Sequence, residues 1–533
     1  MRRLIPKSRT GTFVRFIVAG VLVIGFAATA TAVAGLLQVR QITDYFNAEP
    51  AFSSAPAVKV PDPGSPQTIL LVGSDHRART PFKDVNTDTM MLVRLNPSSS
   101  TINLLSVPRD LEVQIPEGGV PVTGKLNAAY FYGGPNLLIK ILQQQVFPGL
   151  NVNHVVDVGF GGFEQMINAI GCVYTDVDHR YYNNTALTDY SSIDLQPGYQ
   201  KLCGSDALSF VRFRHTDSDI VRNARQQDFI RWAKAQFSQD QVITERNTLL
   251  KIFGKNSTTD HNLHTTDGLI NLFDLVAFSA GNTIKQIPFP AVLLPCAPVP
   301  PTASSTVQQT PCYVGAQSPQ AEQATFRAFM RPTTGSPLPA APAAHSSGAG
   351  GNGSYGGGGG NGSHRGGGRG GVPGLSADVS DGQAQTKALG PIGMPIYYPK
   401  TIVSGSQYCS SATSVCPLET ASPGSYPRAY LLHDQQGVAH YAYRMTLEIN
   451  PILGEYYGVQ GTTWLNPPIL NKPTQTETVN GKQLLLYANG GKVSLVAWRT
   501  AGAVYWVSNT LTDDIPNRQM VGIAASLTRG GGR

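Results

Sequence analysis

A glycine-rich stretch in the last third of the chain constrains the fold more than any other feature of the sequence. Residues 348–371 read GAGGNGSYGGGGGNGSHRGGGRGG and offer almost no apolar side chain to a core. Low-complexity segments of this kind behave as flexible spacers, and 533 residues are too many for one compact core. We therefore expect two folded units, residues 66–332 and 388–533, joined by a Gly-rich linker at residues 333–387.

The N-terminus has the pattern of a membrane anchor. Arginine and lysine concentrate in residues 1–15, and the uncharged run FIVAGVLVIGFAATATAVAGLL follows at 16–37. A run of ~20 apolar residues can cross a bilayer, and flanking basic residues favour the cytoplasmic side. We expect a single-pass protein of the cell membrane with a cytoplasmic N-terminal tail, a transmembrane helix at 16–37, a stalk at 38–65 and the remaining chain outside. The small residues ATA at 28–30 leave cleavage as a signal peptide open as an alternative.

All six cysteines lie beyond the predicted anchor, which agrees with an exterior location where disulfides persist. Their number is even, and the sequence has no Cys-x-x-Cys pair and no Cys/His metal spacing. Pairing in sequence order keeps every bridge within one local region. We therefore predict three disulfides, Cys172–Cys203, Cys296–Cys312 and Cys409–Cys416.

Apolar blocks that begin near residue 68 predict a well-covered sheet. The runs TILLVGSD, TMMLVRLN and TINLLSVPRD are bounded by Gly, Asn-Pro and Pro, as buried strands commonly are. Helical patterns follow at PNLLIKILQQQVF and GFEQMINAI, with the strand VNHVVDVGF between them. Strands interleaved with helices predict an α/β domain with three layers, α-β-α, around a mixed central sheet.

The second unit has a different sequence pattern. The segment QLLLYANGGKVSLVAWRTAGAVYWVSN predicts three strands joined by tight turns at residues 489–490 and 501–502. A final helix is expected to begin at Pro516. We expect a smaller β-rich (α+β) domain, which carries no recognisable catalytic motif and therefore suggests a binding or spacing module.

The segment FVRFRHTDSDIVRNARQQDFIR, residues 210–231, holds five arginines and no lysine. The alternation in FVRFR predicts a strand with its arginines on one face. The turn HTDSD predicts a helix capped by Asp217 or Ser218. Two strand arginines and two helix arginines would then converge beside a helix N-terminus: Arg212, Arg214, Arg222 and Arg225.

This convergence suits an anion with several oxygens. Guanidinium groups bind phosphate bidentately, and a helix N-terminus adds its own N–H donors. The alternative is a structural salt-bridge network with Asp217, Asp219 and Asp228. Spacing alone does not separate the two interpretations.

Other charged residues follow or precede the predicted strands. Arg109 and Asp110 end LLSVPRD, at a sheet edge where ligand sites of α/β proteins tend to lie. Asp75 follows one strand, together with Arg77, and Asp88 begins the next. Two carboxylates at adjoining strand ends can hold a hard cation such as Mg²⁺ against a substrate phosphate. The loop GKLNAAY adds Lys125 and Asn127, and the sequence thus predicts a phosphate site with a metal.

Four ordered blocks give the chain a recognisable relationship. The blocks are TDTMMLVRLNP, SVPRD, KLNAAYFYGG and the RFR…DIVRNARQ segment, with GSDHR in front of them. In order and spacing, residues of about 66–295 resemble the LytR–CpsA–Psr family. The resemblance implies a membrane-anchored cell-envelope enzyme that transfers a glycopolymer from a polyprenyl-pyrophosphate carrier onto peptidoglycan. It also implies that pyrophosphatase activity accompanies the transfer in some members.

The resemblance also implies roles for single residues. Asp75 and Asp88 would hold Mg²⁺, with Mn²⁺ as an alternative ion, and Asp219 would orient the helix arginines or act as a base. The residues expected to act in catalysis are Arg109, Asp219, Arg222 and Arg225. Those expected to bind the pyrophosphate are Arg77, Arg109, Lys125, Asn127, Arg212, Arg214, Arg222, Arg225 and Gln226.

The expected partners are therefore the polyprenyl-pyrophosphate-linked glycopolymer, peptidoglycan and the membrane. Two alternatives stay open: a hydrolase of prenyl pyrophosphates that uses water as the acceptor, and a non-catalytic wall-binding or regulatory protein. A nucleic-acid partner is not expected, because the basic charge clusters at the anchor, the linker and this one site. The polymer itself is not specified by the sequence.

Overall fold

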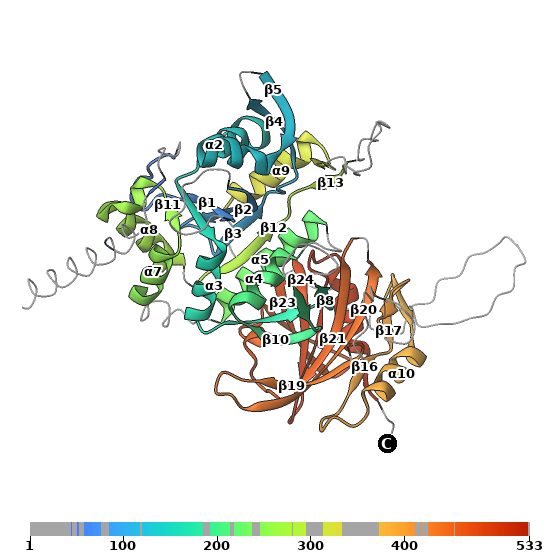
Figure 1. The fold of residues 1–533 in the computed structure, drawn as a ribbon. Coiled ribbons are helices and arrows are strands. Elements are labelled where there is room, and N and C mark those ends of the chain that lie inside the picture. The colour runs from blue at the N-terminus through green and yellow to red at the C-terminus, as the bar shows by residue number, and fades with distance from the viewer. Residues whose placement is uncertain are drawn as a thin grey trace, which may run out of the picture.

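The computed structural model describes residues 44, 51–52, 58–75, 85–117, 120–184, 192–213, 218–236, 246–279, 281–294, 313–332, 372–410, 416, 425–451 and 453–530. Two folded units lie against each other (Figure 1). The predicted anchor and the glycine-rich stretch fall outside the described residues. No described helix is both long and apolar enough to span a bilayer.

A six-stranded mixed sheet forms the centre of the first unit, as predicted. Its strand order is β11-β6-β1-β2-β3-β12. Strand β1 is antiparallel to β2 and parallel to β6, and β3 is antiparallel to β2 and parallel to β12. The strands are β1 (Gln67–Ser74), β2 (Thr87–Leu95), β3 (Thr101–Ser106), β6 (His154–Gly159), β11 (Thr258–Thr259) and β12 (Thr283–Ile287).

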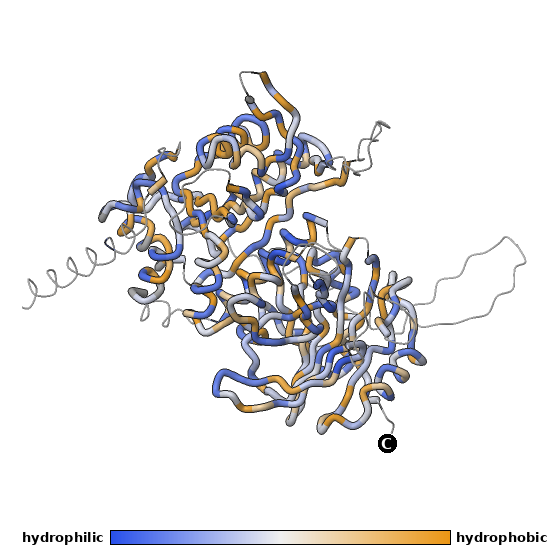
Figure 2. The backbone as a smooth tube through the Cα atoms, viewed as in Figure 1, coloured by the Kyte–Doolittle hydropathy of each residue, from blue (hydrophilic) through white to orange (hydrophobic). Residues whose placement is uncertain are grey.

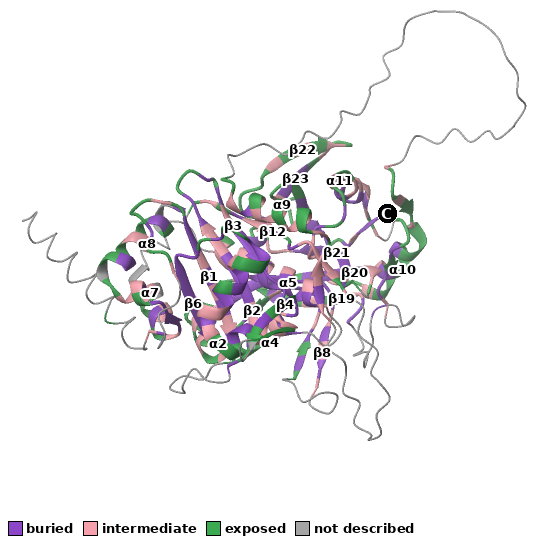
Figure 3. Ribbon diagram, turned by 90° about the horizontal axis from the view of Figure 1, so that it is seen from above, coloured by how far each residue is buried: buried purple, intermediate pink, exposed green. Residues whose placement is uncertain are grey.

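Helices cover both faces of this sheet and confirm the three layers. Alternate strand residues face opposite sides, so Leu70 packs in one core with α2 (Leu126–Ile141) and α9 (Pro319–Met330). Leu71 on the other face packs in two further clusters, which contain residues of α3, α5, α7 and α8. Those helices span Phe160–Ala169 (α3), Asp219–Ala235 (α5), Arg246–Lys255 (α7) and Thr266–Ser279 (α8). Figure 2 shows hydrophobic residues running through the central strands, and Figure 3 shows that these strands are largely buried.

Smaller elements complete the first unit. A helix, α4 (Gly204–Arg212), precedes α5, and a π-helical turn, η1 (Leu142–Val146), extends α2. A 3-10 turn, η2 (His261–His264), precedes α8. Four two-stranded sheets are formed by β4 (Glu112–Glu117) with β5 (Val120–Lys125), β7 (Val173–Val177) with β10 (Gly198–Leu202), β8 (Tyr181–Asn183) with β9 (Ile193–Leu195), and β13 (Ala291–Leu293) with β14 (Val314–Ala316).

The second unit is built on an eight-stranded antiparallel sheet, which confirms its β-rich character. The predicted hairpins correspond to β23 (Lys482–Asn489), β24 (Lys492–Arg499) and β25 (Val504–Ser508), and the predicted last helix is α11 (Asn517–Ser526). The other strands of this sheet are β18 (Gln407–Tyr408), β19 (Arg428–His433), β20 (Ala439–Asn450), β21 (Glu455–Thr462) and β22 (Gln475–Val479), and a 3-10 turn, η3 (Pro468–Leu470), precedes β22. Short pairs join β15 (Leu375–Ala377) to β17 (Thr401–Val403) and β16 (Tyr397–Pro399) to β26 (Leu527–Arg529).

The linker predicted at 333–387 is too long at its C-terminal end. Strand β15 and helix α10 (Val379–Leu389) both lie inside that range or overlap it. The carboxylate of Asp378 caps α10 by accepting the backbone N–H of Asp381 at 3.3 Å. The helix is polar and carries few core residues, so its sequence resembles linker, although Gly382 packs closely against the ring of Tyr398. The second unit therefore begins by Val372.

One face of the second sheet packs on the first unit. Tyr174 of β7 and Tyr199 of β10 share an apolar cluster with Leu495 and Trp506 of the second sheet. At the edge of this cluster, Nη1 of Arg444 lies 3.1 Å from both carboxylate oxygens of Asp176. The two units thus share one continuous interface, which leaves the opposite face of the second sheet to pack on α11.

Two of the three predicted disulfides are present. Cys172 is bonded to Cys203, and Cys409 is bonded to Cys416. The first bridge joins the end of the α3 region to the residue that precedes α4. The predicted pair Cys296–Cys312 lies outside the described residues.

Candidate functional site

The two predicted metal ligands lie where β1 ends and β2 begins. The pairing register shifts between Gly73 and Ser74, so the two strands separate at a bulge there. Asp75 follows the bulge, and its carboxylate accepts the backbone N–H of Asn86 at 2.8 Å and the side-chain amide of Asn86 at 3.3 Å. Asp88 is the second residue of β2. The two carboxylates therefore come from paired strand ends.

Asp88 contacts two of the predicted arginines. Arg109 donates a hydrogen bond to its Oδ1, and Nε of Arg212 lies 3.4 Å from its Oδ2. The guanidinium of Arg212 also stacks on the ring of Phe160, 3.8 Å from the centroid. The three charged side chains are 21–33% exposed, so this part of the cluster is accessible from solvent.

Helix α5 joins the same network through its first turn. Ser218, one of the two predicted caps, accepts the backbone N–H of Val221. Asp219 accepts the backbone N–H of Arg109 at 2.9 Å with one oxygen and the guanidinium of Arg222 with the other. One buried carboxylate thus fixes the loop after β3 and the arginine of α5 to each other, beside a helix end whose N–H groups attract anions.

Among the residues that the structure describes, cations outnumber carboxylates in this network. Four cations, Arg109, Lys125, Arg212 and Arg222, share three carboxylates, Asp88, Asp110 and Asp219. Burial lowers the pKa of the Arg222 guanidinium, and the nearby Arg109 adds to this, while Asp219 opposes it. Within the described part of the chain, the buried Nε of Arg222 has no hydrogen-bond partner. A buried, under-satisfied cation of this kind would be stabilised by an anion.

Lys125 and Asn127 border this network. Nζ of Lys125 lies 3.1 Å from Oδ1 of Asp110, at the junction where β5 ends and α2 begins. The backbone N–H of Asn127 donates to the carbonyl of Arg109 at 3.0 Å. The first turn of α2 therefore holds the loop that carries Arg109.

Arg225 and Gln226 occupy a different position from Arg222. The guanidinium of Arg225 is fully buried, donates to the carbonyls of Phe210 and Phe213 at 3.1 and 2.9 Å, and lies over the ring of Tyr181. The side-chain amide of Gln226 donates to the carbonyl of Val211 at 3.0 Å. These contacts fasten α5 to the end of α4 and give both residues a positioning role in this structure.

The strand predicted for FVRFR is wrong. Helix α4 runs through Val211 and Arg212 and is capped by Phe213, the last described residue of this segment. Ala207, Phe210 and Val211 are buried at the i, i+3 and i+4 spacing of a helix, and the alternation of FVRFR straddles the point where that helix ends. Arg212 reaches Asp88 from the last turn of α4 instead of from a strand.

Three predicted participants fall outside the described residues: Arg77, Arg214 and Asp217. Two aromatic residues that the sequence interpretation missed, Phe160 and Tyr181, support arginines of the cluster. The buried Asp157 was also missed; it accepts hydrogen bonds from Ser74 at 2.6 Å and from Tyr130, and so fixes the end of β1. The sequence did offer a signal for Asp157, because a carboxylate within the otherwise apolar strand VNHVVDVGF is unusual.

The donor set at the strand ends fits a hard divalent cation. Asp75 and Asp88 supply carboxylate oxygens, the ligands that Mg²⁺ and Mn²⁺ take. Mg²⁺ is usually held by one or two carboxylates together with substrate phosphates, and the described residues contain no larger group of metal-binding side chains. Both oxygens of Asp88 contact arginines here, so an ion would exchange with those contacts.

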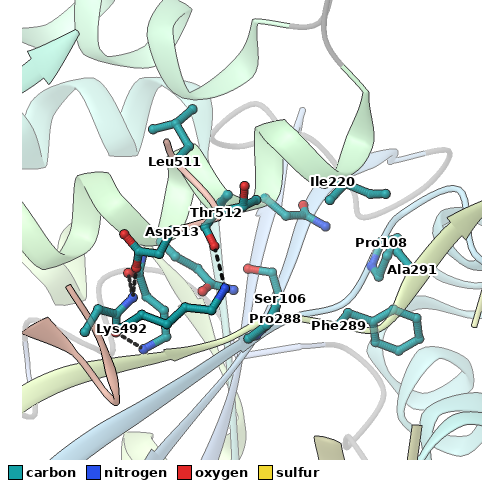
Figure 4. Close-up of a pocket in the computed structure, with 15 residues that line it drawn as sticks. Ser106, Pro108, Ile220, Pro288, Phe289, Ala291, Lys492, Leu511, Thr512 and Asp513 are labelled. Atoms are coloured by element: carbon teal, nitrogen blue, oxygen red, sulfur yellow. Dashed lines mark hydrogen bonds between the residues drawn. The ribbon is translucent and has the colours of Figure 1, made fainter. Parts of the chain in front are cut away.

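A pocket lies on the opposite face of α5 from Arg222. Ile220, Asn223 and Gln227 line it at helical spacing, together with Ser106 at the end of β3. The second unit closes the pocket with a segment that includes Asp513 (Figure 4). It encloses about 90 Å³, and the second unit thereby packs against the back of the arginine helix.

Stability should depend on the ionisation of Asp513. Burial raises the pKa of Asp513 to about 7, with Arg231 opposing the shift and Asp228 adding to it. The fold therefore disfavours the ionised carboxylate, and the free energy of unfolding should fall as pH rises from about 4, the ordinary value, to about 7. Asp513→Asn should raise the free energy of unfolding by about 1–4 kcal/mol at pH 8 and change it little at pH 4. Asparagine also tolerates the φ of 54° at this position.

Urea denaturation of both proteins at pH 4 and pH 8 measures this difference. Asp514→Asn is the matched control, because that neighbouring side chain is 44% exposed. An equal effect of Asp513→Asn at the two pH values would contradict the raised pKa of Asp513.

Comparison with known proteins gives the chain a family and several relatives. The sequence profile of the LytR_cpsA_psr family matches residues 37–325. The polyisoprenyl-teichoic acid–peptidoglycan teichoic acid transferase TagU of Oceanobacillus iheyensis is 32% identical over 200 residues, 36% of this chain and 58% of that protein. The probable cell wall biosynthesis protein LcpB of Corynebacterium glutamicum is 34% identical over 173 residues, 30% of this chain and 39% of that protein.

Solved structures resemble the chain more distantly. The crystal structure of TagV from B. subtilis aligns with 50% of this chain and 96% of its own length, at 22% identity and a TM-score of 0.39. The chain spans about half of the length of the curated relatives it matches. The family profile, in contrast, covers more than half of this chain and includes every predicted metal-binding, pyrophosphate-binding and catalytic residue. The chain belongs to the LytR_cpsA_psr family.

Proposed function

We propose that the protein is an extracytoplasmic, Mg²⁺-dependent phosphotransferase that moves a glycopolymer from a polyprenyl-pyrophosphate carrier onto peptidoglycan. The observation that carries this proposal is the charged network in which Asp88 and Asp219 hold Arg109, Arg212 and Arg222 together. Curated relatives named as teichoic acid–peptidoglycan transferases support the class of reaction.

The reaction would break the phosphoanhydride bond of the carrier and form a phosphodiester bond to peptidoglycan. A hydroxyl of peptidoglycan attacks the phosphorus that carries the sugar and loses its proton, and polyprenyl phosphate leaves with the bridging oxygen. Negative charge grows on the leaving phosphate as this bond breaks. Arg109, Arg212 and Arg222 would stabilise that charge, because preformed donors need no reorganisation during the reaction.

Asp219 acts in this scheme by positioning. Its two oxygens are already engaged by the backbone of Arg109 and the side chain of Arg222, and its side chain is only 2% exposed. These contacts fit orientation of the arginines better than proton transfer. Mg²⁺ held by Asp75 and Asp88 would supply additional charge neutralisation at the pyrophosphate.

The proposal is tested by release of prenyl phosphate. The full-length protein in detergent is incubated with a prenyl-pyrophosphate-linked sugar, with Mg²⁺ or with EDTA. We expect release to require Mg²⁺ and to fall by about 100-fold or more in Asp88→Ala, which removes a carboxylate that orients two arginines. Asp194→Ala is the matched control, because Asp194 pairs with Arg180 away from the network. Release that survives both EDTA and Asp88→Ala would contradict the proposal.

A further inference from the structure

A groove lies between the two units at the far end of α5. Its walls come from the last turns of α5 and the start of β12 in the first unit, and from the β19–β20 turn and the segment 464–474 in the second. It encloses about 720 Å³. The part contributed by the second unit lies beyond the residues matched by the family profile. The groove is therefore a feature that this chain adds to the family domain.

Large aromatic side chains line the groove from both units. Trp232 belongs to α5, Trp464 follows β21, and Tyr487 belongs to β23. Both tryptophans are only partly buried, although each also contacts protein: Arg231 lies 4.0 Å from the ring centroid of Trp232, and His440 stacks on Trp464. Partly exposed indole rings pack well on the apolar faces of sugar rings, while their N–H groups stay available to hydroxyls.

Cationic side chains predominate over acidic ones among the described residues that line the groove. Arg231, Lys234 and Lys472 belong to this lining and no described Asp or Glu does, although Arg231 is paired with Asp228. Burial lowers the pKa of Lys234, and the nearby positive charge of Lys472 adds to this decrease. An anionic group placed between these two lysines would remove their repulsion.

Amide side chains supply the remaining polar surface. Six Asn and Gln residues belong to the lining, among them Gln435 and Gln436 of the β19–β20 turn and Asn471 beside Lys472. Amide groups both donate and accept hydrogen bonds, as sugar hydroxyls do. Aromatic rings, amides and lysines together favour a carbohydrate that carries negative charge.

The position of the groove relates it to the charged network. Asp219 stands at the first turn of α5 and Trp232 near its last turn, 13 residues along. A rise of 1.5 Å per residue places them about 20 Å apart along the helix. The groove and the charged network therefore lie at opposite ends of one helix.

We propose that this groove binds a glycan chain that carries anionic groups, with sugar rings against Trp232 and Trp464 and the negative charge between Lys234 and Lys472. Binding itself depends on the groove alone, whereas its use to hold the acceptor during transfer rests on the proposed function. The same chemistry is offered by peptidoglycan, through its carboxylates, and by an acidic polymer under transfer.

Binding is measured with the full-length protein in detergent by calorimetry and by tryptophan fluorescence, since two of its four tryptophans line the groove. The probes are soluble uncrosslinked peptidoglycan strands and a neutral chitin oligosaccharide of similar length. We expect the peptidoglycan strands to bind more tightly than chitin and to weaken with salt. The double variant Lys234→Gln/Lys472→Gln should raise their Kd by about tenfold or more and remove most of the salt dependence.

Matched variants separate binding from damage to the fold. Lys400→Gln removes an exposed lysine outside the groove and should leave the Kd unchanged. Trp464→Ala should weaken the binding of both probes, and Trp464→Phe should restore part of it. If Trp464→Ala fails to fold, the lysine variants still decide. A Kd that is the same in wild type and in the lysine variants, or equal affinity for both probes, would overturn the proposal.

The two sources of glycan are distinguished by turnover. If the groove holds the acceptor, the lysine variants should raise the KM for peptidoglycan. The same variants should not change Mg²⁺-dependent prenyl phosphate release when peptidoglycan is absent. If the groove holds the transferred polymer, the KM should rise for a polymer-bearing donor and not for a donor with one sugar. If no turnover occurs in the wild type, the proposed function fails, and the binding measurement still tests the groove.

Discussion

Replacing Arg222 by alanine is expected to lower the rate of Mg²⁺-dependent prenyl phosphate release by about 10³-fold, the scale seen when a donor to developing charge is removed. The guanidinium of Arg222 is 1% exposed, is held by Asp219, and keeps its Nε without a hydrogen-bond partner in the described structure. It is therefore oriented in advance by Asp219 and keeps a donor available for an anion. The rate with saturating donor measures this effect apart from donor affinity.

The same substitution leaves Asp219 buried with one of its two partners missing. We therefore expect Arg222→Ala to lower the thermal stability as well, and the stability of each variant must be measured beside its rate. Arg222→Lys keeps the charge without the fork of donors and should recover only part of the rate. Arg331→Ala, which removes an exposed arginine after α9, is the matched control and should change neither quantity. A folded Arg222→Ala protein with a rate within about threefold of wild type would contradict the role of Arg222.

The second large effect is expected at the interface between the two units, where Arg444→Ala should lower the free energy of unfolding by about 3–5 kcal/mol. Arg444 is 1% exposed and belongs to β20. Its Nη1 contacts both oxygens of Asp176 at 3.1 Å and the hydroxyl of Ser508 at 2.9 Å. Removing the guanidinium leaves the buried carboxylate of Asp176 without this partner, which costs more than the lost contact itself.

Denaturant unfolding followed by tryptophan fluorescence measures this effect, because Trp506 lies in the same interface. The double variant Arg444→Met/Asp176→Leu should recover much of the lost stability, since it removes both charges from the interior. Lys400→Gln again serves as a surface control. A loss below about 1 kcal/mol in Arg444→Ala would show that the ion pair does not hold the units together.

Features that depend on neighbouring residues were predictable from the sequence. Strands β1, β2, β3 and β6 of the first sheet, strands β23 to β25 of the second, the turn after Asn489 and the start of α5 at Ser218 follow from local apolar patterns, turn residues and caps. The strand predicted at FVRFR failed because its alternation spans the end of a helix. Helix α10 was missed because a polar surface helix offers little apolar periodicity.

Contacts between segments far apart in the chain were harder to predict from the sequence. Family motifs placed Arg222 and Arg225 in one site, but only the structure separates them: Arg222 joins Asp219, whereas Arg225 enters an aromatic cage that includes Tyr181. The pairing of Asp176 with Arg444 joins residues 268 positions apart and has no local signal. The same holds for the groove between the units, whose walls come from segments more than 150 residues apart.

A wall hydroxyl, and not water, is expected to attack the phosphorus that carries the sugar. The most direct measurement runs the reaction of full-length protein, polyprenyl-pyrophosphate-linked glycan, Mg²⁺ and soluble peptidoglycan strands in ¹⁸O-water, with mass spectrometry of both products. Transfer predicts a glycan–phosphate ester on peptidoglycan and free polyprenyl phosphate, neither carrying ¹⁸O. Appearance of ¹⁸O in a released phosphate, without any ester on peptidoglycan, would contradict the transferase and identify a hydrolase.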